Sequence, residues 1–98
     1  MPLSETKLKS KVMQFIKKQY PEAWIYKAAD RFTSGIPDIL ICKEGQFYAV
    51  ELKVGSNKPT PIQEYVMRQI RKAGGRVSVA RSVEDVRKFI ERGGDGNV

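Results

Sequence analysis

Asp38, Glu51 and Lys53 are the residues of this chain whose types and spacing are best suited to chemistry. Asp38 begins one short apolar segment, and Glu51 and Lys53 end the next one. If these segments form a β-hairpin with a two-residue turn, the carboxylates lie directly opposite each other, with Cβ atoms about 4.5–5.5 Å apart. Lys53 then projects from the same face, since side chains alternate along a strand. The sequence therefore predicts two carboxylates and an ammonium group at one end of a hairpin.

Two carboxylates that face each other destabilise a sheet, and burial among apolar neighbours increases the cost. The pair becomes tolerable if one carboxyl group keeps its proton, or if a divalent cation lies between them. Carboxylates with open coordination positions suit Mg²⁺ or Mn²⁺ and leave room for a phosphate. Lys53 could then steady an attacking water or the charge that develops on the phosphate. The alternative is that Asp38 only caps a turn, while Glu51 and Lys53 form a solvated pair on an edge strand.

The composition indicates one small domain with a polyanionic partner. The chain has 98 residues and a formal net charge of +7, from 18 Lys and Arg against 11 Asp and Glu. This excess favours nucleic acid as a partner over charge that serves solubility alone. The absence of histidine excludes Ser-His-Asp and Cys-His catalysis and any histidine-bound zinc. A cytoplasmic protein is expected, because the sequence has no apolar signal-peptide core and no apolar run of about 20 residues.

The elements that must position the cluster follow from apolar periodicity and capping signals. Helices are expected at residues 5–20, 61–73 and 83–92, with Ser4, Thr60 and Ser82 as N-caps, and strands at 23–28, 38–43, 46–54 and 76–80. This order indicates an α/β domain spanning residues 1–92, with a mixed central sheet flanked by helices. A disordered tail is expected at residues 93–98.

The sequence also predicts the surroundings of several apolar and aromatic side chains. The apolar stripe of the second helix is expected to comprise Ile62, Val66, Ile70 and Ala73. Cys42, the single cysteine, is expected to be a small buried hydrophobe. Trp24 and Tyr26 are expected in the core or at an interface.

The motifs resemble those of a known nuclease family. "GIPDILI" at 35–41 followed by "YAVELK" at 48–53 resembles the core of the PD-(D/E)xK nucleases. "TPIQ" at 60–63 and "GGRVSVARSVED" at 74–85 resemble the VRR-NUC branch, the virus-type replication-repair nucleases. The resemblance covers roughly residues 4–92. It implies a PD-(D/E)xK-like core of αβββαβα order, in a stand-alone copy of a domain that is elsewhere fused to larger repair proteins.

The resemblance also implies roles for individual residues. Asp38, Glu51 and the backbone carbonyl of Leu52 would bind Mg²⁺ or Mn²⁺, Lys53 would be the catalytic lysine, Glu5 would lie beside the metal, and Gln63 would be the glutamine that follows the Glu-x-Lys strand. Two of these residues have structural alternatives. Glu5 could simply favour the positive end of its helix. Gln63 also fits a capping box with Thr60.

DNA contacts are predicted in two regions of the chain. The loop before Asp38 offers Arg31, Ser34 and Gly35, and a basic set around the second helix comprises Lys58, Arg68, Arg71, Lys72 and Arg76. Lysines and arginines in such a patch could track phosphates, and glycine allows close approach of the backbone. The alternatives are a plain connecting loop and a solvated helix face.

On this resemblance, the expected function is metal-dependent, structure-selective hydrolysis of DNA phosphodiester bonds. Similar stand-alone proteins resolve four-way (Holliday) junctions, so a homodimeric junction resolvase in DNA repair is expected, in a host cell infected by a phage or carrying a prophage. One alternative is a flap, nicking or restriction-type nuclease with the same chemistry. The other is a non-catalytic nucleic-acid-binding module on a nuclease fold.

Overall fold

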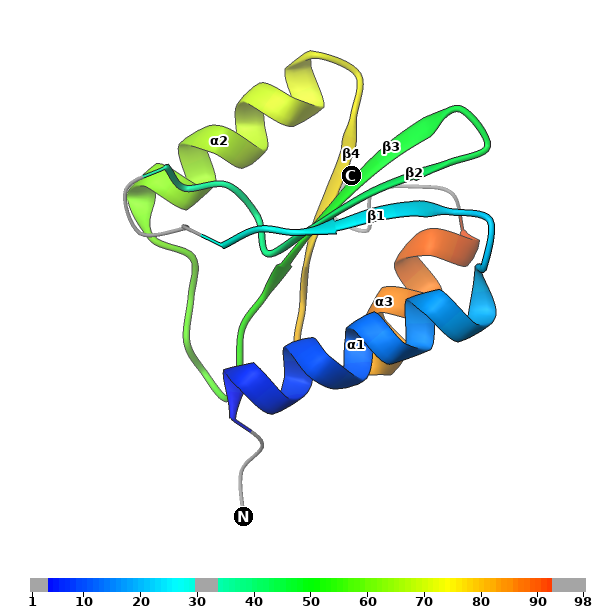
Figure 1. The fold of residues 1–98 in the computed structure, drawn as a ribbon. Coiled ribbons are helices and arrows are strands. Elements are labelled where there is room, and N and C mark those ends of the chain that lie inside the picture. Colours follow the sequence, from blue (N-terminus) through cyan, green and yellow to red (C-terminus); the bar gives the residue numbers. More distant parts are fainter. Residues whose placement is uncertain (1–3, 30–33, 93–98) are drawn as a thin grey trace.

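Four strands form one mixed sheet in the order β1-β2-β3-β4, with helices on both faces (Figure 1). The computed structural model describes residues 4–29 and 34–92, so the expected tail at 93–98 lies outside the described residues. The elements are α1 (Glu5–Gln19), β1 (Trp24–Lys27), β2 (Ile39–Lys43), β3 (Gln46–Leu52), α2 (Pro61–Lys72), β4 (Arg76–Ala80) and α3 (Val83–Glu91). The predicted α/β class and the αβββαβα order are confirmed. No helix in the described ranges is long and apolar enough to cross a membrane.

The central hairpin of β2 and β3 has the register that its turn predicts. The two strands are antiparallel, and their partners run from Lys43 and Gln46 at the turn to Ile39 and Val50. Glu44 and Gly45 have positive φ angles of 51° and 78°, as both central residues of a type I′ turn require. One further step along this register places Asp38 opposite Glu51. Local turn chemistry therefore sets which residues meet at the far end of the hairpin.

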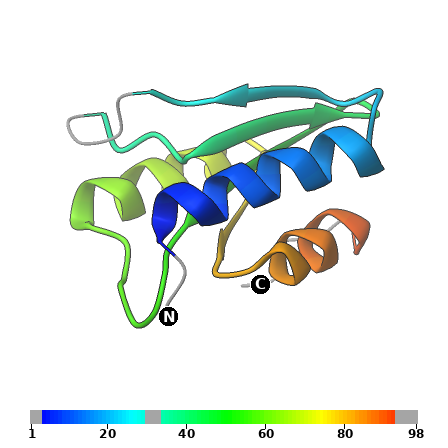
Figure 2. The same ribbon diagram turned by 60° about the horizontal axis from the view of Figure 1, so that its bottom comes forward.

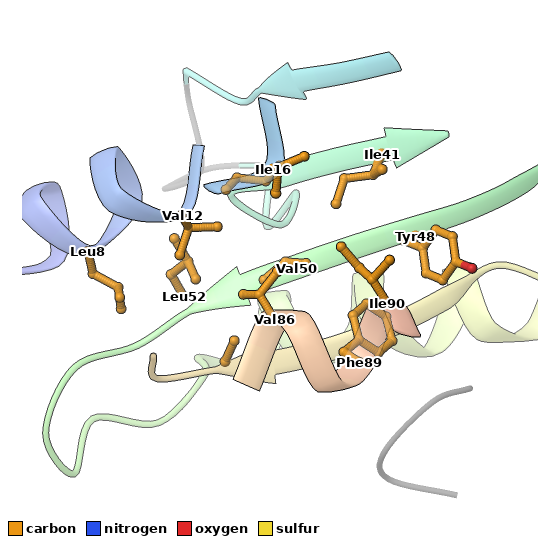
Figure 3. Close-up of a cluster of buried hydrophobic side chains, with 12 residues drawn as sticks. Leu8, Val12, Ile16, Ile41, Tyr48, Val50, Leu52, Val86, Phe89 and Ile90 are labelled. Carbon is orange, nitrogen blue, oxygen red and sulfur yellow. The ribbon is translucent and has the colours of Figure 1, made fainter. Parts of the chain in front are cut away.

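The sheet separates two apolar clusters. Alternate side chains of β3 point to opposite faces. On one face, the buried residues belong mainly to the strands, α1 and α3 (Figures 2 and 3): Leu8, Val12, Ile16, Ile39, Ile41, Tyr48, Val50, Leu52, Ala80, Val86, Phe89 and Ile90. On the other face, Met67 of α2 packs on Ala49 and Val77. β3 pairs with β2 and β4, and both of its faces are covered, so its far end is buried.

The apolar face of α2 differs from the predicted stripe. Met67 and Gln63 are the buried residues of the helix, whereas Ile62 is 42% exposed and Ala73 is also exposed. The assignment of Ile62 and Ala73 to the buried stripe was therefore wrong. The capping box at the start of α2 turns Gln63 inward, and the face that meets the sheet is rotated by about one residue.

An aromatic patch remains uncovered on the α2 side of β1 and β2. Trp24 and Tyr26 are 58% and 50% exposed, and their rings stack at 6.1 Å. Ile25 between them packs into the opposite cluster, so the two rings share the other face. Cys42 pairs with Trp24 across the strands and is exposed. The expectation that Cys42 is buried was wrong, because α2 packs over β3 and β4 and leaves this edge of the sheet open.

Candidate active site

The hairpin ends bring Asp38, Glu51 and Lys53 together, as their spacing predicts. Asp38 and Glu51 are both 0% exposed, and the Lys53 side chain is 11% exposed. The Lys53 Nζ lies 3.5 Å from Glu51 Oε2. The alternative of a solvated pair on an edge strand is excluded, since β3 is a central strand and Glu51 is fully buried.

Asp38 is held by backbone groups of both neighbouring strands. The Leu52 N–H of β3 donates to Asp38 Oδ2 at 2.7 Å. The Ala28 N–H, one residue past β1, donates to the Asp38 carbonyl at 2.8 Å. These bonds fix the carboxylate beside the peptide group that joins Glu51 to Leu52. A hydrogen bond of this kind to a carboxylate is short and strong.

Lys9 is a residue of the cluster that the sequence interpretation missed. Its Nζ lies 3.3 Å from Asp38 Oδ1, and its side chain is 17% exposed. Each buried carboxylate therefore has an ammonium partner: Lys9 on Asp38 and Lys53 on Glu51. The sequence offered one signal, because Lys9 follows Glu5 by four residues and the two share a face of α1.

Glu5 and Gln63 lie in different structural settings from the hairpin carboxylates. Glu5 is half-buried in the first turn of α1. Across residues 4–29 and 34–92, no group of three or more acidic, histidine or cysteine side chains is placed to hold a metal ion. Gln63 completes the predicted capping box: its Oε1 accepts from the Thr60 N–H at 2.9 Å, and its own N–H donates to the Thr60 Oγ1 at 3.3 Å.

The donor set fits a hard divalent cation. Asp38 Oδ1 and both carboxylate oxygens of Glu51 are buried atoms, and the Leu52 N–H donates to the other oxygen of Asp38. Mg²⁺ and Mn²⁺ prefer such oxygen ligands, and Mg²⁺ keeps several waters when one or two carboxylates bind it. The cluster therefore offers ligands of the right chemistry.

The predicted DNA-binding residues around α2 differ in their exposure and local contacts. Arg68 and Arg71 line a shallow pocket beside α2, and an Arg71 Nη2–H donates to the Val77 carbonyl at 3.2 Å. Of the remaining basic residues, Lys58 and Lys72 are exposed and Arg76 is half-buried, and Arg31 lies outside the described residues.

Gly35 and Ser34 have local structural roles in the loop before Asp38. Gly35 is buried with a φ of +71°, and a Cβ there would come within 2.7 Å of the Ile62 carbonyl oxygen. The glycine therefore lets this loop pack against the first turn of α2. The Ser34 Oγ accepts from the Ile36 N–H at 3.3 Å.

The mixed sheet, the helices on both faces and the carboxylates of the central hairpin define an α/β fold of the PD-(D/E)xK nuclease class. A solved structure described as "VRR_NUC domain" is 31% identical and has a TM-score of 0.66, covering 85% of this chain and 94% of that one. A second, "VRR_NUC domain protein", has a TM-score of 0.76 at 21% identity, covering 100% of this chain and 97% of that one. The sequence matches no protein-family model and no curated protein. The chain belongs to the VRR-NUC family of nucleases, the family that its motifs resemble.

Proposed function

We propose that this protein is a metal-dependent endonuclease that hydrolyses DNA phosphodiester bonds. The observation that carries the proposal is the burial of Asp38 and Glu51 at 0% exposure beside Lys53. Removing such charged groups from water costs several kcal/mol per ion. The attraction between a carboxylate and an ammonium group often fails to offset this cost. An arrangement this costly to a small fold is typical of a catalytic site rather than of a structural ion pair.

Each residue has a defined part in the proposed reaction. Asp38, Glu51 and the Leu52 carbonyl would hold Mg²⁺ or Mn²⁺, which supplies an activated water and neutralises phosphate charge. In the reaction, the water oxygen bonds to phosphorus while the bond from phosphorus to the leaving oxygen breaks. The Lys53 ammonium donates a hydrogen bond to the phosphate oxygen on which negative charge develops. Contact with Glu51 orients that ammonium. Glu5 and Gln63 are proposed as supporting residues, with Gln63 held rigid by its capping box.

The proposed substrate is a four-way DNA junction, and the proposed active form is a homodimer. One such site cuts one strand, so paired cuts in a symmetric junction need two sites related by a two-fold axis. The uncovered patch of Trp24, Tyr26 and Cys42 supports dimerisation, because exposed aromatic groups are enriched at protein interfaces.

Cleavage of a labelled immobile junction and of a matched linear duplex tests the nuclease proposal. Wild type and Asp38→Asn are compared with Mg²⁺, with Mn²⁺ and with chelator. Metal-dependent, symmetric nicks on the junction alone, lost in Asp38→Asn, would support the resolvase. Equal cutting of junction, flap and duplex would leave a nuclease of the flap, nicking or restriction type. Tight binding without cutting in both proteins would favour a non-catalytic binding module.

Sedimentation velocity tests the homodimer separately. The wild-type sedimentation profile should correspond to a mass twice the 11.1 kDa of one chain. Trp24→Lys should sediment as a monomer, because a charge would then be buried at the two-fold contact. Non-reducing denaturing gels after oxidation give a second readout, since Cys42 beside the patch could form a disulfide between two copies. A wild type that remains monomeric at micromolar concentration would contradict the dimer.

A further inference from the structure

A basic groove runs between α1 and the edge strand β1. Its lining includes three lysines, Lys9, Lys17 and Lys27, and otherwise consists of Thr6, Ser10, Met13 and Gln14. None of these described lining residues is acidic. Hydroxyl, amide and ammonium groups are the side-chain donors that bind phosphate oxygens. The groove therefore has the chemistry of a phosphate-binding surface.

One end of this groove is the catalytic cluster. Lys9 both lines the groove and lies 3.3 Å from Asp38 Oδ1. Lys27 immediately precedes Ala28, whose N–H donates to the Asp38 carbonyl. A strand that follows the groove would thus arrive at the carboxylates without leaving a lysine-lined path.

The lysines of α1 divide between two faces of the helix. At 100° per residue, the buried side chains Leu8, Val12 and Ile16 mark the core face of α1. Lys9 and Lys17 lie on a second face, next to β1. Lys7 and Lys18 are exposed and do not line the groove; by helical geometry they lie about 80–180° around the axis from its lysines. Two lysines therefore carry equal charge on the same helix without lining the groove.

We propose that this groove binds the phosphate backbone of the DNA strand adjoining the scissile bond. The proposal rests on the proposed nuclease function and adds a binding surface to it. Lys9 and Lys17 are separated by about 12 Å along the helix axis, at 1.5 Å per residue. That length equals the rise of about three to four base pairs along a duplex axis. Lys27 flanks the path from the opposite wall.

A pair of double variants tests the groove against general surface charge. Lys17→Ala/Lys27→Ala removes two charges from the groove, and Lys7→Ala/Lys18→Ala removes two from outside it. Binding of each protein to labelled junction and duplex is measured by fluorescence anisotropy in chelator, across a salt series. Chelator keeps the DNA intact, so the result does not depend on cleavage. Lys17→Arg/Lys27→Arg serves as the conservative variant.

The groove variant should bind about tenfold more weakly at 0.1 M salt, and the slope of log K against log salt should fall by about 1.8 on duplex. The Lys7/Lys18 variant should lose less than about threefold with a smaller change in slope, and the arginine variant should retain binding. Equal losses in the two alanine variants would overturn the proposal, as would unchanged binding of the groove variant. Circular dichroism melts confirm that each variant is folded. If wild type binds through the groove but never cleaves, the nuclease proposal fails, while the groove remains a DNA-binding surface without a scissile bond beside it.

Discussion

Replacing Lys53 by methionine should tighten Mg²⁺ binding while abolishing cleavage. Lys53 lies 3.5 Å from Glu51 Oε2. Its positive charge therefore weakens the attraction of this carboxylate for a cation. Methionine keeps a long unbranched side chain but removes the charge. One substitution should therefore raise the affinity for Mg²⁺ and lower the rate of cleavage.

Coulomb's law sets a lower bound for the gain in affinity. An ion about 2.1 Å from Glu51 Oε2 would be at most about 6 Å from the Lys53 Nζ. Two positive charges on the ion and one on the ammonium then repel by about 1.4 kcal/mol in bulk water, and by about 5.5 kcal/mol at an effective dielectric constant of 20. The Lys53 side chain is only 11% exposed, so the water value is the lower limit. The Mg²⁺ dissociation constant should fall at least about tenfold.

Calorimetric titration of Mg²⁺ into DNA-free protein measures this change independently of activity. Thermal melts give a second reading: at a Mg²⁺ concentration ten times the wild-type dissociation constant, binding should stabilise wild type by about 1.4 kcal/mol and Lys53→Met by about 2.7 kcal/mol. Lys72→Met, at an exposed position of α2, is the matched control and should bind Mg²⁺ as wild type does. Asp38→Asn should bind little or none. Unchanged or weaker Mg²⁺ binding by Lys53→Met would refute the assignment of Glu51 as a metal ligand next to the Lys53 ammonium.

Three further predictions concern the scaffold. Gly35→Ala should destabilise the fold by about 1–3 kcal/mol more than Gly55→Ala in thermal melts, because both glycines have positive φ but only Gly35 meets backbone within 4 Å; equal losses would contradict this packing. Thr60→Ala and Gln63→Ala each break the capping box and should lower the free energy of unfolding by about 1 kcal/mol. Only Gln63→Ala should also slow cleavage more than tenfold. Equal cleavage rates in the two variants would leave Gln63 a purely structural role. Burial and a hydrogen bond to α3 raise the pKa of Tyr20 from 10.0 to about 12, so the stability it confers is complete below pH 10 and is lost as the pH rises through 12. Tyr20→Phe should flatten that part of the melting-temperature profile, and an unchanged profile would count against the bond.

The hairpin and its cluster could be predicted from the sequence because local rules set them. Glu44 and Gly45 fix the turn type, the turn fixes the register, and the register brings Asp38 opposite Glu51. The helix caps were predictable for the same reason. In the structure, Ser4, Thr60 and Ser82 each accept the expected backbone bond. These contacts join residues that are close in the chain, so no knowledge of tertiary packing was needed.

The remaining features depend on how the elements pack. Lys9 meets Asp38 only because α1 crosses the sheet beside the hairpin end, a contact between residues 29 positions apart. The buried face of α2 depends on its rotation against β3 and β4. Trp24 is exposed because α2 does not reach β1. Residue type gave no position for Lys9, gave the wrong buried face for α2, and left core and interface open for Trp24, since burial was decided by a distant element.

The two lysines also explain how so small a fold can bury two facing carboxylates. The sequence interpretation offered a retained proton or a divalent cation, but Lys9 and Lys53 supply a positive charge for each carboxylate within 3.5 Å. The fold can therefore assemble without a bound ion, unlike structural zinc sites, whose binding energy is folding energy. It follows that chelator should abolish cleavage while leaving the melting transition cooperative. A metal added later competes with the two ammonium groups for the carboxylates. Lys9 also lines the basic groove, so a DNA phosphate bound there could replace Asp38 as the ion-pair partner of Lys9.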